Sequence, residues 1–376
     1  MSERIARFLA EQTPETPCLV VDLDVIGAAY EGLRRYLPLA QIYYAVKANP
    51  AAEIVRMLNR KGASFDVASR GEIGLCLDNG VTPDKLSFGN TIKKERDIAH
   101  AYRAGVRLFA FDSADELAKL ARAAPGSRVF CRILVTCDGA EWPLSRKFGC
   151  APEMAVDLLR QARDAGLDPY GISFHVGSQQ TDLGQWDGAV GAAARMFSAL
   201  AELDINLRMV NIGGGFPAHY SGEVPGVEHY ARAVMSAITR HFGNDLPEII
   251  IEPGRSLVGD AGIIQSEVVL ISEKGGGDGR RWVYLDVGKF NGLAETMDES
   301  IKYRIVAPGR GGSAGPVVLA GPTCDSADIL YERTEYRLPL GLRVGDKVEI
   351  LSTGAYTASY ASVGFNGFAP IRTYCV

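Results

Sequence analysis

IYYAVKA (42–48), VFCRILV (129–135) and EIIIEPG (248–254) are three of eight short apolar runs in the first two-thirds of the chain. The other five are SFDVAS (64–69), LSFG (86–89), LFAFD (108–112), YGISFHVG (170–177) and MVNIGGG (209–215). Helical patterns separate the runs, and most of these end on glycine, the residue favoured just past a helix C-terminus. Strands that alternate with helices predict a parallel sheet, and eight such units in about 250 residues predict a (β/α)8 TIM barrel. A doubly wound sheet is the alternative, but its first strand usually carries a glycine fingerprint that this one lacks.

The pattern changes after residue 258. GIIQSEVVLIS, RWVYLDVG, PVVLAG and KVEILSTGAYT are strand-like runs separated by glycine-rich turns, with no amphipathic helix of ten residues between them. We therefore predict an α/β barrel over 22–258 and a mostly β domain over 259–376. The segment 1–21 is expected to add an N-terminal strand to this second domain, because CLVVDLD (18–24) precedes the first barrel strand.

The composition excludes several classes of protein. Of the 376 residues 47% are apolar and 23% are charged, as in a folded globular protein, and a net charge of −5 argues against a nucleic-acid binder. Seven scattered cysteines without a Cys-x-x-Cys pair favour reduced thiols over disulfides or a metal site. Neither an apolar leader nor a run of 18 apolar residues is visible, so we expect a soluble cytoplasmic protein with no membrane contact.

Polar side chains fall where the predicted strands end, and in barrel enzymes the chemistry lies at the carboxyl ends of the strands. Lys47 ends the first strand, directly after a buried apolar run. Alone, it would suggest a lysine that reaches from the strand end to solvent. Five other strands carry polar residues or glycines at the same end: Asp66, Arg132, His175 with Ser178, Gly213 to Gly215, and Glu252 with Pro253, Gly254 and Arg255. This coincidence favours a nucleophilic amine at the barrel mouth.

The glycine run indicates the kind of ligand that the Lys47 amine would bind. Gly213, Gly214 and Gly215 expose backbone N–H groups that can cradle a phosphate, and Gly254-Arg255 follows at the next strand. A flexible turn is the alternative for the glycines, and a core histidine is the alternative for His175. An amine that can form a Schiff base, together with a phosphate cradle, indicates pyridoxal phosphate. Glu252 would then face the ring nitrogen, and His175 would lie against the ring.

These motifs resemble those of the fold-type III pyridoxal-phosphate decarboxylases, the family of the ornithine, lysine, arginine and diaminopimelate enzymes. The stretches that carry the likeness are QIYYAVKANP (41–50), SFDVASRGE (64–72), FHVGSQ (174–179), NIGGGFP (211–217), EPGR (252–255), GPTCDSAD (321–328), GAYT (354–357) and FNGF (365–368). The family pairs an alanine-racemase-like barrel with a β domain. The likeness is strongest to its ornithine decarboxylase branch, and it implies decarboxylation of L-ornithine to putrescine for polyamine synthesis.

The resemblance also implies a role for each residue. Lys47, His175 and Cys324 would be catalytic, with Cys324 returning a proton to Cα. The cofactor would contact Lys47, Asp66, Arg132, His175, Ser178, Gly213, Gly214, Gly215, Glu252, Pro253, Gly254, Arg255 and Tyr356. The diamino-acid substrate would contact Met297, Asp298, Asp325 and Phe365, although Asp298 lies in AETMDES, where a solvated acidic face is the alternative. The family further implies a homodimer with shared active sites, in which Lys147 and Asp328 pair between subunits.

Other activities remain open at this point. Lysine or meso-diaminopimelate could be the substrate, because EPGRS (252–256) and Ser326 depart from the animal ornithine enzymes. A racemase is disfavoured because that branch places an arginine, not Glu252, at the ring nitrogen. A non-catalytic relative should have lost Lys47, the glycines or Cys324. A sugar-phosphate barrel enzyme would explain the glycines but not Cys324 and Tyr356.

Overall fold

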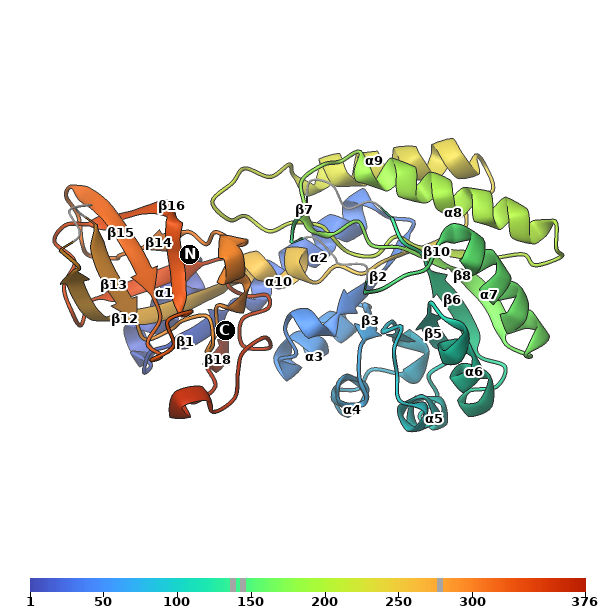
Figure 1. The fold of residues 1–376 in the computed structure, drawn as a ribbon, viewed down its shortest axis with the longest axis horizontal. Helices are drawn as coiled ribbons and strands as arrows, with labels where there is room; N and C mark the ends of the chain where they lie inside the picture. The colour runs from blue at the N-terminus through green and yellow to red at the C-terminus, as the bar shows by residue number, and fades with distance from the viewer. Residues whose placement is uncertain (136–139, 143–146, 276–279) are drawn as a thin grey trace. The chain divides into compact units, whose positions relative to one another are not determined.

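The computed structural model describes residues 1–135, 140–142, 147–275 and 280–376. It divides the chain into two compact units that do not follow chain order, both drawn in Figure 1. The barrel unit comprises Gly27–Pro217 and Val224–Gly254, and the β unit comprises Met1–Ile26, Ala218–Glu223 and Arg255–Val376. The β unit therefore takes in a short loop from within the barrel segment and begins four residues earlier than the predicted boundary at 259.

The barrel unit confirms the eight-strand prediction. Its strands are β2 (Ala40–Ala45), β3 (Ser64–Val67), β4 (Leu86–Phe88), β5 (Leu108–Phe111), β6 (Arg128–Arg132), β8 (Asp168–Ser173), β10 (Met209–Asn211) and β11 (Glu248–Ile251). Neighbouring strands are parallel, and β11 pairs back onto β2 with Ile250 opposite Gln41, which closes the barrel and excludes a doubly wound sheet.

Helices cover the outer face of the barrel strands (Figure 1). They are α2 (Leu23–Tyr36), α3 (Ala52–Arg60), α4 (Arg70–Asp78), α5 (Glu95–Arg103), α6 (Ala114–Ala123), α7 (Pro152–Asp164), α8 (Gln185–Ala201) and α9 (Val227–Phe242). Helix α2 precedes β2, and the others each connect one barrel strand to the next. Their apolar residues recur at helical spacing, as in α3, where Ile54, Val55 and Leu58 are fully buried. None of the helices in the described ranges is long and apolar enough to cross a membrane.

Apolar side chains fill the middle of the barrel. This core cluster is made of Tyr43, Leu108, Ala110, Phe130, Tyr170, Met209 and Ile250, which come from six of the eight strands. In parallel strands successive side chains alternate between the two faces, so Asn211 and Glu252 follow Met209 and Ile250 on the inner side. The packed core therefore supports a polar layer at the carboxyl ends of the strands.

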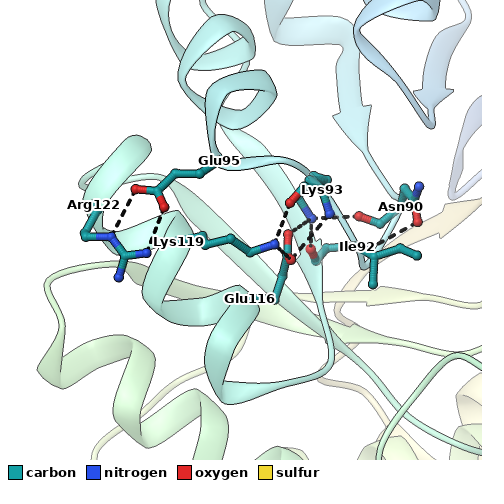
Figure 2. A network of polar contacts seen from close by, with 8 residues as sticks. Asn90, Ile92, Lys93, Glu95, Glu116, Lys119 and Arg122 are labelled. Atoms are coloured by element: carbon teal, nitrogen blue, oxygen red, sulfur yellow. Dashed lines mark hydrogen bonds and ion pairs between the residues drawn. The ribbon is translucent and has the colours of Figure 1, made fainter.

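A buried polar cluster fixes the loop after β4 (Figure 2). The Lys93 side chain is fully buried, and its ammonium lies 2.9 Å from Glu116 Oε1 on α6. The same ammonium donates to the carbonyls of Asn90 (2.7 Å) and Ala110 (2.6 Å). Lys119 reaches Glu116 Oε2 at 2.5 Å from the more exposed side. The loop is thereby tied to β5 and to the first turn of α6.

The β unit is built around one eight-stranded sheet. Six strands follow the order β14 (Ile305–Val306), β17 (Lys347–Leu351), β12 (Gly262–Glu273), β13 (Arg281–Leu285), β15 (Ala314–Ala320) and β16 (Ile329–Pro339). The other two are β1 (Cys18–Val21), which pairs with β12, and β18 (Arg372–Cys375), which pairs with β1. Beside it lie the short helix α10 (Arg255–Val258) and the 3₁₀ turns η3 (Gly259–Ala261), η4 (Ala294–Glu299) and η5 (Phe365–Gly367).

The N-terminal segment differs from the strand expected over 1–21. Helix α1 (Glu3–Gln12) occupies most of it, and only Cys18–Val21 is a strand. Ser2 caps the helix by accepting a hydrogen bond from the Ile5 N–H at 3.3 Å. Ile5 and Leu9, one turn apart, pack against Cys18, Val20 and Ile263. The i, i+4 apolar spacing decided the helix.

Candidate active site

The structure brings the barrel residues predicted for the site to one end of the barrel unit. Parallel strands place all their carboxyl ends on the same rim. Asp66 lies within β3 and Arg132 ends β6, while the other residues follow strand ends directly. These are Lys47 after β2, His175 after β8, Gly213 to Gly215 after β10, and Glu252, Pro253 and Gly254 after β11, whereas Ser178 begins the short strand β9 (Ser178–Gln180).

Lys47 does not continue its strand. β2 ends at Ala45, and the 3₁₀ turn η1 (Val46–Ala48) follows, with Val46 and Ala48 buried on either side of the lysine. The Lys47 side chain is about half exposed, and Nζ lies 3.2 Å from Oδ2 of Asp66, whose side chain is 5% exposed. A lysine that only reached for solvent would not meet a buried carboxylate, so the turn presents the amine at the barrel mouth.

Asp66 has an oxygen without a protein partner. Its Oδ1 is buried and accepts no hydrogen bond from the described part of the chain. The carboxylate fits because the residue after β4 is Gly89, where a Cβ atom would lie 2.0 Å from this oxygen. Since buried acceptors in folded proteins nearly always find a donor, Asp66 Oδ1 is suited to a ligand with an N–H group or a positive charge.

Glu252 is a carboxylate balanced between two protonation states. Burial, together with the negative charge of Asp66, raises the pKa of Glu252 to about 7. The charges of Lys47 and Arg132 lower it, as does the hydrogen bond that Asn211 donates to Oε1 at 2.5 Å. Such a group can share a proton with an aromatic ring nitrogen that has a pKa in the same range.

The glycine run makes close backbone contacts that no other residue would permit. A Cβ atom at Gly213 would lie 2.4 Å from the Phe174 carbonyl oxygen, and at Gly215 it would lie 2.6 Å from the Gly177 carbonyl oxygen. Both residues have positive φ, +69° and +96°, which glycine adopts without strain. Within the described chain no group accepts a hydrogen bond from the N–H of Gly214 or Gly215. These two donors suit an anionic ligand such as a phosphate.

His175 is held as a neutral ring. The Gly177 N–H donates to Nδ1 at 3.0 Å, so this nitrogen carries no proton and Nε2 carries one. Burial, together with the positive charges of Arg132 and Lys47, lowers the pKa of His175 well below its usual 6.5. A Cβ atom at Gly214 would lie 3.4 Å from Nε2, which places the ring beside the glycine run. A neutral imidazole can stack on an aromatic ligand without a charge.

In the β unit, Arg255 is the centre of a buried polar group. Its guanidinium forms a two-pronged pair with Glu295, at 2.6 and 2.7 Å, and also donates to the Tyr220 hydroxyl at 2.6 Å. The Tyr356 ring lies 4.9 Å from its Cζ, so the structure brings together the two β-unit residues predicted for the phosphate. Arg255 is 4% exposed and Glu295 is 3% exposed, so the pair fixes the orientation of the guanidinium.

Cys324 and Asp325 lie on an exposed loop of the β unit. The side chain of Asn366 accepts a hydrogen bond from the Cys324 N–H at 3.1 Å, and its Oδ1 lies 3.4 Å from Sγ. Phe365, the residue before Asn366, lies with its ring 4.7 Å from that of Phe290. The loop that carries Cys324 is therefore held beside the segment that carries Phe365.

Met297 and Asp298, the other two predicted substrate contacts, lie on η4 and are both exposed. Asp298 has a φ of +52°, and the turn buries Glu295 on the side opposite to it. The same turn thus carries a buried partner of Arg255 and an exposed carboxylate.

Asp328 lies at the base of the loop that carries Cys324. It is 2% exposed, and its carboxylate accepts hydrogen bonds from the N–H groups of Lys289 (2.8 Å) and Thr323 (3.1 Å) and from the Thr323 hydroxyl (2.8 Å). A buried carboxylate with three donors of its own anchors the base of the Cys324 loop, and its pairing with Lys147 between subunits stays a prediction.

Three residues with a part in these clusters were not predicted: Asn211, Glu295 and Tyr220. Asn211 is a polar residue at the end of a buried strand, the same signal that singled out Lys47 and Glu252. Glu295 stands in a segment with three acidic residues in seven, where sequence does not show which one turns inward. Tyr220 gave no signal, because a tyrosine in a loop is unremarkable.

The donor set of the barrel mouth fits pyridoxal phosphate. Lys47 offers an amine for the aldehyde, Glu252 a carboxylate for the ring nitrogen, His175 a neutral ring face, and Gly214 and Gly215 two N–H groups for the phosphate. The unpaired Asp66 oxygen offers a further acceptor beside the amine. Each chemically distinct part of the cofactor has a counterpart.

Comparisons with known proteins agree with this fit. Residues 23–259 match the family model described as "Pyridoxal-dependent decarboxylase, pyridoxal binding domain". The chain is 36% identical over 370 residues to a lysine/ornithine decarboxylase of Selenomonas ruminantium, covering 98% of this chain and 91% of the relative. It is 33% identical over 371 residues to a chloroplastic ornithine decarboxylase of Nicotiana glutinosa, covering 95% and 83%.

Among solved structures, a lysine/ornithine decarboxylase of Vibrio vulnificus complexed with cadaverine superimposes with a TM-score of 0.89. It is 31% identical, and the match covers 100% of this chain and 99% of that one. The relatives and the solved structure match nearly the whole length, and the family model matches residues 23–259. The chain therefore belongs to the pyridoxal-dependent decarboxylases, a family of enzymes that act on amino acids with pyridoxal phosphate as cofactor.

Proposed function

We propose that this enzyme decarboxylates L-ornithine to putrescine and carbon dioxide, and so supplies a diamine for polyamine synthesis. The observation that carries the proposal is the exposed loop on which the Cys324 thiol and the Asp325 carboxylate are adjacent. A thiol can return a proton to Cα, and a carboxylate can bind the distal ammonium of a diamino acid. The similarity to enzymes named for lysine and ornithine supports the same substrate class.

Each of the predicted residues would hold one part of the cofactor. Lys47 would bind it covalently through its amine, with Asp66 keeping that amine in place at 3.2 Å. His175 would cover the ring as a neutral imidazole, and Glu252 would hold a proton on the ring nitrogen. Gly213 to Gly215, Ser178, Gly254, Arg255 and Tyr356 would bind the phosphate, and Arg132 and Pro253 would support the site. When bound, the cofactor supplies an electron-withdrawing ring that stabilises negative charge at Cα.

The reaction requires one bond to break and one proton to arrive. The bond between Cα and the carboxylate carbon breaks, and carbon dioxide leaves. The electron pair of the broken bond stays on Cα. Cys324 then donates its Sγ proton to Cα, which forms the new C–H bond. The thiolate recovers a proton from water, which the exposure of Cys324 allows.

Substrate choice would depend on charge at the distal end. Asp325 and Asp298 are both exposed carboxylates, and an ammonium at the end of the substrate side chain would pair with them. Phe365 and Met297 would line the methylene chain. meso-Diaminopimelate ends in a carboxylate as well as an ammonium, so the two aspartates would repel it. Lysine, one methylene longer, is the second candidate, because the relative from Selenomonas ruminantium is named for both amino acids.

We further propose a homodimer in which Cys324 of one subunit serves the Lys47 site of the other. Its support is the family resemblance and the exposure of the Cys324 loop within its own chain. Mixing Lys47→Ala and Cys324→Ala chains tests it, since neither variant alone has a complete site. Random exchange in a two-fold dimer should restore about a quarter of the wild-type activity. If the mixture recovers none after subunit exchange has been verified, the sites are not shared.

The substrate assignment is tested by carbon dioxide release from purified, cofactor-loaded enzyme. L-Ornithine, L-lysine, L-arginine and meso-diaminopimelate would be supplied separately, and kcat/KM compared. We expect ornithine to have the highest value and putrescine to be the product. A higher kcat/KM for lysine or meso-diaminopimelate would overturn the ornithine assignment but leave the cofactor chemistry intact.

A further inference from the structure

Asn211 connects two parts of the barrel mouth through its side chain. It ends β10, is 1% exposed, and uses both ends of its side-chain amide. Nδ2 donates to Glu252 Oε1 at 2.5 Å, and Oδ1 accepts from the Gly213 N–H at 2.9 Å. One side chain therefore contacts both the carboxylate that faces the ring nitrogen and the first glycine of the phosphate loop.

The orientation of this amide is set by its partners. A backbone N–H can only donate, so the atom that faces Gly213 must be the amide oxygen. The nitrogen then faces Glu252, and its N–H can donate to a carboxylate oxygen. A flipped amide would place its oxygen against the Glu252 carboxylate and its N–H against the Gly213 N–H, which would lose both hydrogen bonds.

The surrounding backbone makes this connection rigid. The Glu252 N–H donates to the Gly213 carbonyl at 2.8 Å, and the Ile212 N–H donates to the Ile250 carbonyl at 3.0 Å. These bonds join the two chain segments directly after Asn211. The amide closes a ring of hydrogen bonds through Glu252 and Gly213, and Gly213 keeps its φ of +69° within that ring.

The charges that face Glu252 come from three strands. Asp66 on β3 disfavours the ionised carboxylate, while Lys47 after β2 and Arg132 on β6 favour it. Asn211 is the neutral group among these neighbours that supports the ionised form by a hydrogen bond. Its contribution is directional, because an N–H bond fixes the carboxylate rotamer, whereas the three charges act through the field around it.

We propose that Asn211 is a positioning residue that keeps Glu252 ionised and aimed, and that links the ring-nitrogen end of the cofactor site to its phosphate loop. This inference rests on the proposed role of Glu252 at the ring nitrogen. It predicts that a change at residue 211 alters cofactor binding both at the ring-nitrogen end and at the phosphate loop. The cofactor would bind less tightly, and the pH at which binding is lost would move.

Two substitutions separate the two functions. Asn211→Asp keeps an oxygen for the Gly213 N–H but replaces the donor to Glu252 with a second carboxylate. Asn211→Ala removes both bonds. In Asn211→Asp the ionised form of Glu252 is disfavoured, so we expect the midpoint of cofactor binding against pH to rise by about one unit. Near pH 7 this corresponds to about tenfold weaker binding, since one pKa unit is a factor of ten.

Asn291 in the β unit provides a matched control. It is 5% exposed, accepts from the Gly288 N–H at 2.6 Å and donates to the Asp286 carbonyl at 3.0 Å. Asn291→Asp therefore also puts a charge in place of a buried amide that bonds on both sides. It should lower the melting temperature without moving the pH midpoint of cofactor binding.

The experiment measures the dissociation constant of pyridoxal phosphate from the holoenzyme by fluorescence between pH 6 and pH 9. Wild type, Asn211→Asp, Asn211→Ala, Asn291→Asp and Glu252→Gln would be compared, with circular dichroism to verify folding. A raised midpoint in Asn211→Asp and weaker binding in Asn211→Ala would support the inference. An unchanged midpoint in a folded Asn211→Asp variant would overturn it.

The remaining outcomes are also decisive. If both Asn211 variants fail to fold while Asn291→Asp folds, the amide has only a structural role and the inference is wrong. If Glu252→Gln binds the cofactor as wild type does at every pH, the proposed role of Glu252 fails, independently of Asn211. Thus a failure of the inference can be told from a failure of the function on which it rests.

Discussion

Removing Glu116 should destabilise the barrel by an amount that depends on pH, because the group it balances is a buried amine. Burial lowers the pKa of Lys93 from its usual 10.5 to about 8, and Glu116 limits this decrease. Lys119 lowers the pKa further and Asp112 raises it. In Glu116→Gln the buried ammonium loses its counterion. Lys93 can then stay charged at a cost, or release its proton.

Release of the Lys93 proton sets the size of the destabilisation by Glu116→Gln. Releasing the proton costs about 1.4 kcal/mol for each pH unit below 8. The substitution should therefore cost about 1.4 kcal/mol at pH 7, about 3 kcal/mol at pH 6 and close to nothing at pH 9. In the wild type, the folded state releases the Lys93 proton before the unfolded state does. The contribution of this lysine to stability thus rises with pH between 8 and 10.5.

Thermal unfolding measures this dependence. Trp186, fully buried in α8, reports on the barrel unit by fluorescence. For a unit of this size, about 3 kcal/mol at pH 6 corresponds to a melting temperature lower by about 6–12 °C. Lys93→Met is the control, because without the ammonium the Glu116→Gln substitution should add no pH-dependent cost. An equal penalty at pH 6 and pH 9, or one that persists in the Lys93→Met background, would refute this reasoning.

Three further predictions concern the proposed site. Cys324→Ala should lower kcat by about 10²–10⁴-fold, the usual contribution of a general acid, without weakening cofactor binding; a kcat near wild type would remove the thiol from the mechanism. Asp325→Ala should lower kcat/KM for ornithine by about 30-fold or more if the distal ammonium pairs with it in a dry site, and Asp325→Asn shows whether charge or shape is responsible. Glu295→Gln should weaken cofactor binding about tenfold by freeing the Arg255 guanidinium, as equilibrium dialysis would show; unchanged affinity would limit Glu295 to a structural role.

Much of the barrel could be predicted because its strands are short, apolar and regularly spaced. A run such as 248–254 has few alternatives once a helix precedes it, and the rim residues follow from where the runs end. The exact end of the first barrel strand was harder to predict from the sequence. The sequence suggests a strand through Ala48, but the chain turns at Val46, since Lys47 could not face Asp66 from a continuing strand.

The N-terminal helix and the buried partners were harder to predict for a physical reason. Residues 3–12 were expected within an N-terminal strand, and their apolar helix face is decided by packing on Cys18 and Ile263, which lie far apart in the sequence. Glu295 and Lys93 are charged residues in charged surroundings, and only their burial distinguishes them from their neighbours. Burial of a charge depends on a partner from another element, which a local pattern does not contain.

The account depends most directly on Lys47 as the residue that binds the cofactor covalently. Reduction of the holoenzyme with borohydride would fix the cofactor to its lysine, and peptide mapping by mass spectrometry would locate it. Lys93 is the internal comparison, because burial also lowers the pKa of its amine, to about 8. The account predicts a pyridoxyl group on the peptide that contains Lys47 and none on the peptide that contains Lys93. A modification found on Lys93, or on any lysine other than Lys47, would contradict it.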